Sequence, residues 1–68
     1  MKFIECHEKE TNTRVLIPLD KIITLSQSHE DLTAFVELHI DKDGNSVGFY
    51  TKELYVEIVA QIRLKNQI

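Results

Sequence analysis

Two short segments of this sequence carry residues that can ligate a metal ion. Phe3–His7 (FIECH) and Phe35–His39 (FVELH) share one alternating pattern, which on a β-strand places Phe, Glu and His on one face and apolar residues on the other. If the two strands lay side by side, their carboxylates and imidazoles could bind Zn²⁺ or Fe²⁺. The four candidate ligands are Glu5, His7, Glu37 and His39.

A polar sheet face exposed to water is the simpler interpretation of these four residues. The first and fourth strands of a meander are not neighbours, so only closure into a barrel or a dimer would bring the four side chains together. We therefore expect no metal ion and no other cofactor, and we keep a metal-binding Glu/His face as the lesser alternative.

Other reactive residue types fit structural roles better. Cys6 points away from His7 on an alternating strand, so this pair lacks the geometry of a Cys–His nucleophile, and Cys6 is predicted to be a buried structural residue. Asp43-Gly44 is typical of a turn, because an EF-hand loop needs its glycine two positions later and a glutamate where Lys52 stands. The sequence has no Gly-rich phosphate-binding loop and no paired-cysteine spacing. We therefore predict that the protein is not an enzyme.

Length, charge and cysteine content limit the remaining classes. The 68 residues suffice for a single domain, residues 1–68, and the net charge is −3 with dispersed Lys and Arg. This charge pattern disfavours nucleic-acid binding. A single cysteine cannot form an internal disulfide, which favours a reducing compartment. Because there is no signal-type segment and no run of roughly 20 apolar residues, we expect a cytoplasmic protein without membrane partners.

Alternating apolar residues predict five strands joined by polar turns. Pro18 cannot donate a ladder hydrogen bond and is expected at a strand end, and Ile23 and Leu25 are expected to face the same side. The segment His29–Asp31 is interpreted as a solvated charged loop. The expected strands are Lys2–His7, Val15–Ile17, Ile22–Ser26, Thr33–Ile40 and Val47–Tyr50.

A valine follows each of the two repeated phenylalanines at the same spacing, Val15 after Phe3 and Val47 after Phe35. This correspondence indicates either one hairpin used twice or chance agreement between two alternating strands.

The C-terminal segment Thr51–Ile68 is predicted to form an amphipathic helix. Thr51 is the expected N-cap, Glu53 suits the first turn, and Tyr50 and Tyr55 occupy the positions of a hydrophobic staple. Helical spacing places on one face the residues Leu54, Tyr55, Ile58, Val59 and Ile62. The predicted fold is therefore α+β: a small curved antiparallel sheet of about five strands, in the order β-β-β-β-β-α, covered by one C-terminal helix.

Two sets of apolar residues are predicted to lie on the outside. Val56, Ala60 and Leu64 form a second helix stripe facing away from the sheet, and Phe3 and Phe35 lie on the outer sheet face. These residues are either scattered surface hydrophobics or a contact surface for a second copy or another protein.

Residues in the bend, in the last hairpin and at the helix also fit the pattern of a known family: Pro18, Asp20, Ile22, Gly44, Val47, Thr51, Glu53, Ile58 and Ile62. Through them the chain resembles, over nearly its whole length, the small bacterial motility-associated FlbD (SwrD) family. That resemblance implies this architecture and a non-enzymatic role, although the first hairpin lacks the glycine that is usual in the family.

The C-terminal part is also similar to LytTR-type DNA-binding domains, through the Asp-Gly turn and the pair Lys52 and Leu54. The acidic balance argues against DNA binding, because basic residues that neutralise phosphates supply most non-specific affinity for DNA. We expect a small non-enzymatic interaction or regulatory protein whose partner is a protein, a second copy of the chain being one candidate. A nucleic-acid-binding module is the alternative.

Overall fold

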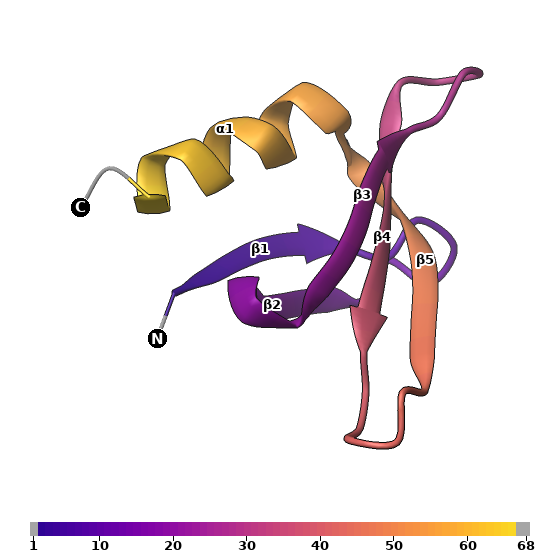
Figure 1. Cartoon of the computed structure of the whole chain (residues 1–68). Coiled ribbons are helices and arrows are strands. Elements are labelled where there is room, and N and C mark those ends of the chain that lie inside the picture. Colours follow the sequence, from indigo (N-terminus) through magenta and orange to yellow (C-terminus); the bar gives the residue numbers. More distant parts are fainter. Residues whose placement is uncertain (1, 67–68) are drawn as a thin grey trace.

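The structure is a computed structural model that describes residues 2–66, in which five strands precede one helix (Figure 1). Strands β1 and β2 form one antiparallel sheet, and β3, β4 and β5 form a second in that order. The elements are β1 Phe3–His7, β2 Arg14–Pro18, the 3₁₀ turn η1 Leu19–Lys21, β3 Ile22–Gln27, β4 Thr33–His39, β5 Ser46–Leu54 and α1 Tyr55–Asn66. The predicted α+β class and element order are confirmed, with the five strands divided between two sheets.

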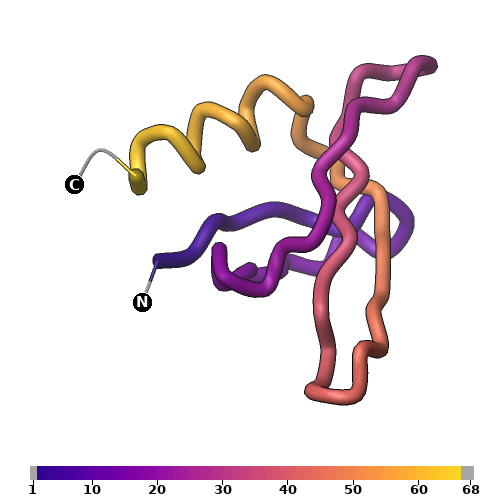
Figure 2. The backbone as a smooth tube through the Cα atoms, viewed as in Figure 1, coloured from indigo at the N-terminus to yellow at the C-terminus, as the bar shows by residue number. Residues whose placement is uncertain are grey.

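The two sheets meet where the end of β1 reaches the middle of β5. Glu8 and Thr51 form an antiparallel bridge, and the Lys9 amide donates a 2.8 Å hydrogen bond to the Tyr50 carbonyl. The helix and most of the N-terminal hairpin lie on the same side of the three-stranded sheet (Figure 2). One core therefore lies between the helix, the hairpin and the sheet.

A large bulge in β5 makes this junction possible. Thr33 pairs with Leu54 and Phe35 pairs with Tyr50, so three residues of β5 lie opposite Ala34 alone. The Thr51 side chain is fully buried, and its Oγ1 lies 3.3 Å from both the amide nitrogen and the carbonyl oxygen of Ala34. Oγ1 accepts a hydrogen bond from the Ala34 amide, and its single proton is shared between the Glu53 carbonyl, at 2.9 Å, and the Ala34 carbonyl. The hydroxyl thus provides partners for backbone groups that the bulge leaves without regular ladder bonds, while the Thr51 backbone bridges to β1.

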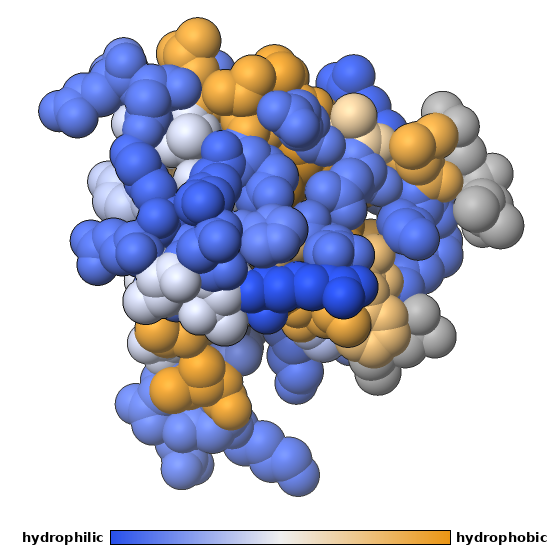
Figure 3. All heavy atoms as spheres, turned by 180° about the vertical axis from the view of Figure 1, so that it is seen from behind, coloured by the Kyte–Doolittle hydropathy of each residue, from blue (hydrophilic) through white to orange (hydrophobic). Residues whose placement is uncertain are grey.

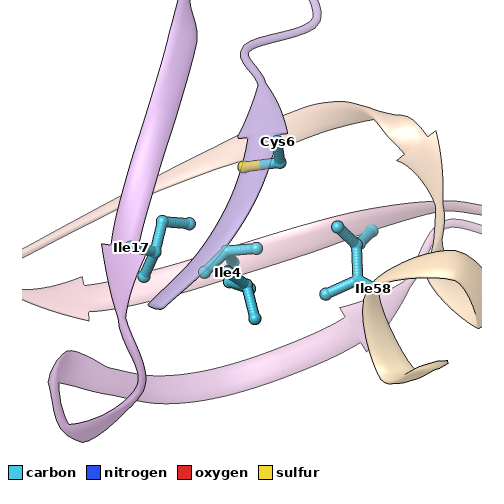
Figure 4. Packing of buried hydrophobic residues seen from close by; sticks show 6 residues of the cluster. Ile4, Cys6, Ile17 and Ile58 are labelled. Carbon is cyan, nitrogen blue, oxygen red and sulfur yellow. The ribbon is translucent and has the colours of Figure 1, made fainter. Parts of the chain in front are cut away.

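Alternation along the strands builds the core, and one helix residue closes it. The apolar residues that are at most 1% exposed are Ile4, Cys6, Ile17, Ala34, Val36 and Ile58. Figure 4 shows Ile4, Cys6 and Ile17 of the first hairpin gathered near Ile58 of α1. The inward orientation predicted for these residues is confirmed.

The predicted start of the helix is wrong by four residues. Because β5 pairs with β4 as far as Leu54, α1 begins at Tyr55, whose amide donates a 2.8 Å hydrogen bond to the Leu32 carbonyl. Thr51 is therefore a buried strand residue and no N-cap, Glu53 lies in β5, and Tyr50 packs on the sheet rather than in a staple. The predicted C-terminal end, residues 67–68, lies outside the described residues.

Three predicted positions of apolar residues also differ. A register shift between Ile22 and Thr24 turns Ile23 outward to 43% exposure, so that Ile22 and Leu25 contact the core instead. Ile40 lies beyond the end of β4 and is 60% exposed, and Leu54 is 41% exposed at the junction of strand and helix. In each case a bulge or a strand end breaks the local periodicity.

The repeated sequence pattern corresponds to two hairpins of the same geometry. Each has a six-residue connection, residues 8–13 in the first and 40–45 in the second. In each hairpin the glutamate of the first strand contacts the first residue of the second strand. Glu5 contacts Arg14 of β2, and Glu37 accepts a hydrogen bond from Ser46 of β5. The register is the same in both, as the equivalent pairs show: Phe3–Pro18 and Phe35–Tyr50, His7–Arg14 and His39–Ser46.

The hydroxyl of Thr51 generates a prediction about stability. Thr51→Val keeps the volume but leaves the Ala34 amide and the Glu53 and Ala34 carbonyls without this partner, so the free energy of unfolding should fall by about 1–3 kcal/mol. Thr51→Ser keeps the hydroxyl and loses one buried methyl group, which should cost about 1 kcal/mol. Urea denaturation of both variants tests this, and a valine variant as stable as the serine variant would contradict the assigned role.

Candidate interaction surfaces

The structure does not bring the four candidate metal ligands together. β1 and β4 belong to different sheets, and three of the four side chains already have protein partners. Among residues 2–66, no group of three or more His, Cys, Asp or Glu side chains is arranged to hold a metal ion. The partnered pairs are Glu5 with Arg14, His7 with Glu53, and Glu37 with Ser46.

His7 of β1 and Glu53 of β5 form a polar contact at two points. The His7 amide donates a 2.8 Å hydrogen bond to Oε1 of Glu53, and His7 Nδ1 lies 2.8 Å from Oε2. Partial burial raises the pKa of Glu53, but the hydrogen bonds from the His7 ring and amide outweigh burial and hold this pKa below its ordinary value of 4.5. Sequence reasoning missed the pair because it placed Glu53 in the helix.

Cys6 is the buried structural cysteine that its position predicted. Its side chain is fully buried, and burial, followed by the charges of Glu53 and Glu5, raises the pKa of the thiol to about 11. The thiol is therefore protonated near neutral pH. Because only the thiolate is an effective nucleophile, Cys6 is unreactive in this state.

The charged loop between β3 and β4 has a partner that the sequence did not reveal. Asp31 forms an ion pair with Lys9 and accepts hydrogen bonds from the amide and the hydroxyl of Thr33, at 3.2 and 2.7 Å. The Lys9 and Thr33 donors hold the pKa of Asp31 far below its ordinary range. These contacts link the β3–β4 loop to the β1–β2 turn.

The helix stripe Val56, Ala60 and Leu64 faces outward, as predicted. Val56 is 61% and Leu64 62% exposed, and the stripe borders a shallow apolar hollow also lined by Tyr55 and Val59. In Figure 3, hydrophobic atoms gather along the top of the molecule over α1. Ile58 is buried on the opposite side of the same helix, so the stripe rests on a rigid support.

The two aromatic residues predicted on one outer sheet face lie on different sheets, because β1 and β4 do not belong to the same sheet. Phe3 is 41% exposed on β1, while Phe35 is half-buried on β4 and packs against Tyr50 of β5. The two ring centroids lie 4.8 Å apart with an interplanar angle of 61°. Phe35 therefore belongs to an aromatic pair, and Phe3 stands apart from it.

Searches of family models, curated proteins and solved structures find no match to this chain. The resemblance to the FlbD family therefore stays a prediction. Among residues 2–66, α1 is too short and too polar to cross a membrane.

The His7–Glu53 pair generates a prediction about pH. Because the pKa of Glu53 is lower in the folded than in the unfolded chain, ionised Glu53 stabilises the fold above pH 4.5, and this stability is lost as the pH falls through the folded pKa. His7→Ala should raise the pKa of Glu53 measured by carbon NMR and lower stability at neutral pH by about 1 kcal/mol.

His7→Asn supplies the control for this prediction, because its side-chain amide can donate from nearly the position of Nδ1. It should restore part of the pKa depression that His7→Ala removes. Equal Glu53 titration curves for the wild type and His7→Ala would contradict the assignment.

Proposed function

We propose that this is a small non-enzymatic interaction or regulatory protein of the cytoplasm, which acts by protein–protein contact and self-associates through its helix stripe. The observation that carries the proposal is the outward apolar face of α1, with Val56 and Leu64 each more than half exposed. A lone buried cysteine, free in the described structure, supports a reducing compartment.

The shape of the stripe suits a second copy of the same helix. Ala60 lies between Val56 and Leu64, and a small residue at the centre lets two helix axes approach closely. A two-fold dimer places one surface against itself, so Ala60 would face Ala60 of the partner with larger side chains on either side. The hollow beside the stripe, about 550 Å³ in volume, offers space for those side chains.

The energetics of the stripe favour a weak contact. Burial of Val56 and Leu64 supplies roughly 1.5–3 kcal/mol for each side chain in each copy. Association costs roughly 4–15 kcal/mol in lost freedom of motion, so the surplus is small. A 68-residue domain also has a small core, and association adds to its stability.

The charges on the surface support a protein rather than a nucleic acid as partner. Two of the basic side chains are engaged in ion pairs, Lys9 with Asp31 and Arg14 with Glu5, and the chain has a net charge of −3. Phosphate contacts require basic groups free to replace counterions.

Leu64→Glu tests self-association directly. A glutamate at position 64 would be buried in the contact without a partner, so the dimer dissociation constant should rise at least about tenfold, the equivalent of about 1.4 kcal/mol. Sedimentation equilibrium and native mass spectrometry over a range of concentrations measure this, and circular dichroism checks that the variant stays folded.

Ile40→Glu is the matched control, because Ile40 is 60% exposed and lies in the β4–β5 turn, away from the helix. It should leave the association constant unchanged. A folded Leu64→Glu variant that dimerises like the wild type, or a wild type that stays monomeric at every concentration, would contradict the proposal.

A further inference from the structure

An aromatic pair on the outer face of the three-stranded sheet lies away from the helix and from the core. Phe35 and Tyr50 are cross-strand neighbours on β4 and β5, with their rings in an edge-to-face arrangement. Their chain neighbours Ala34, Val36 and Thr51 point inward and are buried, so the two rings point outward. Tyr50 is 50% exposed, which leaves aromatic surface open to solvent.

Gly48 allows the Phe35 ring to lie across the backbone of β5. A Cβ atom at Gly48 would lie 2.5 Å from Cζ and 3.0 Å from Cε2 of Phe35. Real Cβ atoms do not approach a ring so closely, so any other residue would displace the ring. The glycine backbone and the two rings, inclined at 61° to each other, thus form one continuous aromatic surface.

Two hollows, of about 480 and 510 Å³, adjoin this surface, and both are lined by Phe35, Tyr50 and Lys9. We name them together the aromatic hollow. The Lys9 amide donates a hydrogen bond to the Tyr50 carbonyl, and the Lys9 ammonium forms an ion pair with Asp31. These two contacts fix the β1–β2 turn as one wall of the hollow.

The charge around the aromatic hollow is predominantly negative. Glu30 lines one part, and Glu8 and Glu10 line the other. The one ammonium among the lining residues, that of Lys9, already has Asp31 as its partner. An incoming cation would therefore meet aromatic rings between carboxylates.

We propose that the aromatic hollow binds an arginine or lysine side chain presented by a basic segment of a partner protein. Cations are attracted to the faces of aromatic rings, and a guanidinium group can also stack on them. Carboxylates at both ends complement the positive charge and repel phosphate groups, which disfavours a nucleic acid. The inference goes beyond the proposed self-association and does not depend on it, because the two surfaces share no residue.

A capped Gly-Arg-Gly-Arg-Gly peptide is a suitable probe, and the same peptide with citrulline in place of both arginines is its control. Citrulline keeps the shape of arginine and removes the charge. In a proton–nitrogen NMR titration at low salt, the arginine peptide should shift the amides of Gly48, Tyr50 and Lys9 in a saturable manner. The citrulline peptide should not, and added salt should weaken binding of the arginine peptide.

Variants then separate the aromatic from the electrostatic contribution. Tyr50→Leu keeps an apolar side chain and should weaken binding about two- to five-fold, the equivalent of about 0.5–1 kcal/mol. Glu8→Gln with Glu30→Gln should also weaken it, whereas Asp20→Asn, a single charge removal in the exposed turn η1, is the control and should not. The NMR spectra themselves show whether each variant is folded.

Several outcomes would overturn the inference. These are equal shifts with both peptides, shifts confined to α1, saturable binding of a single-stranded oligonucleotide in the hollow, or concentration-dependent shifts at Gly48 and Tyr50 without any peptide. The last would mean that a second copy occupies the hollow. Because Leu64→Glu leaves the hollow intact, loss of peptide binding and loss of self-association are observed separately.

Discussion

The fold depends on one buried hydroxyl group. At the bulge in β5, Thr51 Oγ1 lies within hydrogen-bonding distance of the Glu53 carbonyl and of the Ala34 amide and carbonyl. In a regular ladder these Ala34 groups would be paired with the backbone of β5. The Thr51 backbone can therefore bridge to Glu8 and join the two sheets. The same bulge directs Glu53 toward His7 and lets β5 continue to Leu54 before α1 begins. An unpaired buried backbone group is costly, so this exchange of partners constrains the whole junction.

This junction separates two surfaces with different chemistry. On one side, the helix held by Ile58 presents the apolar stripe Val56, Ala60 and Leu64. On the other side, the outer face of β4 and β5 presents the aromatic hollow with carboxylates around it. A chain of 68 residues buries too little of its surface to form a deep cleft, so both proposed contact sites are open surfaces. The two surfaces share no lining residue, so the two proposed contacts would not compete for one site.

Local periodicity predicted much of this architecture, and bulges account for the errors. Ile4, Cys6, Ile17 and Val36 were placed in the core because side chains alternate along a strand regardless of its partner. Ile23 and Thr51 were placed wrongly because each lies at a register shift, where the alternation breaks without any signal in the local pattern. The helix stripe was predicted correctly, whereas Tyr50 was assigned to a staple and so its pairing with Phe35 was missed.

The sequence by itself determined the order of the elements, the apolar face of each strand, the outward stripe of the helix and the lone core cysteine, because these follow from residue spacing within one segment. It also contained the repeat of two hairpins, whose common register the structure shows. The tertiary structure alone decided that the strands divide into two sheets, that Glu53 meets His7 and Asp31 meets Lys9, and that Gly48 lies under the Phe35 ring. Those contacts join residues far apart in the chain, and which segments meet depends on the packing of all elements together rather than on spacing within any one of them.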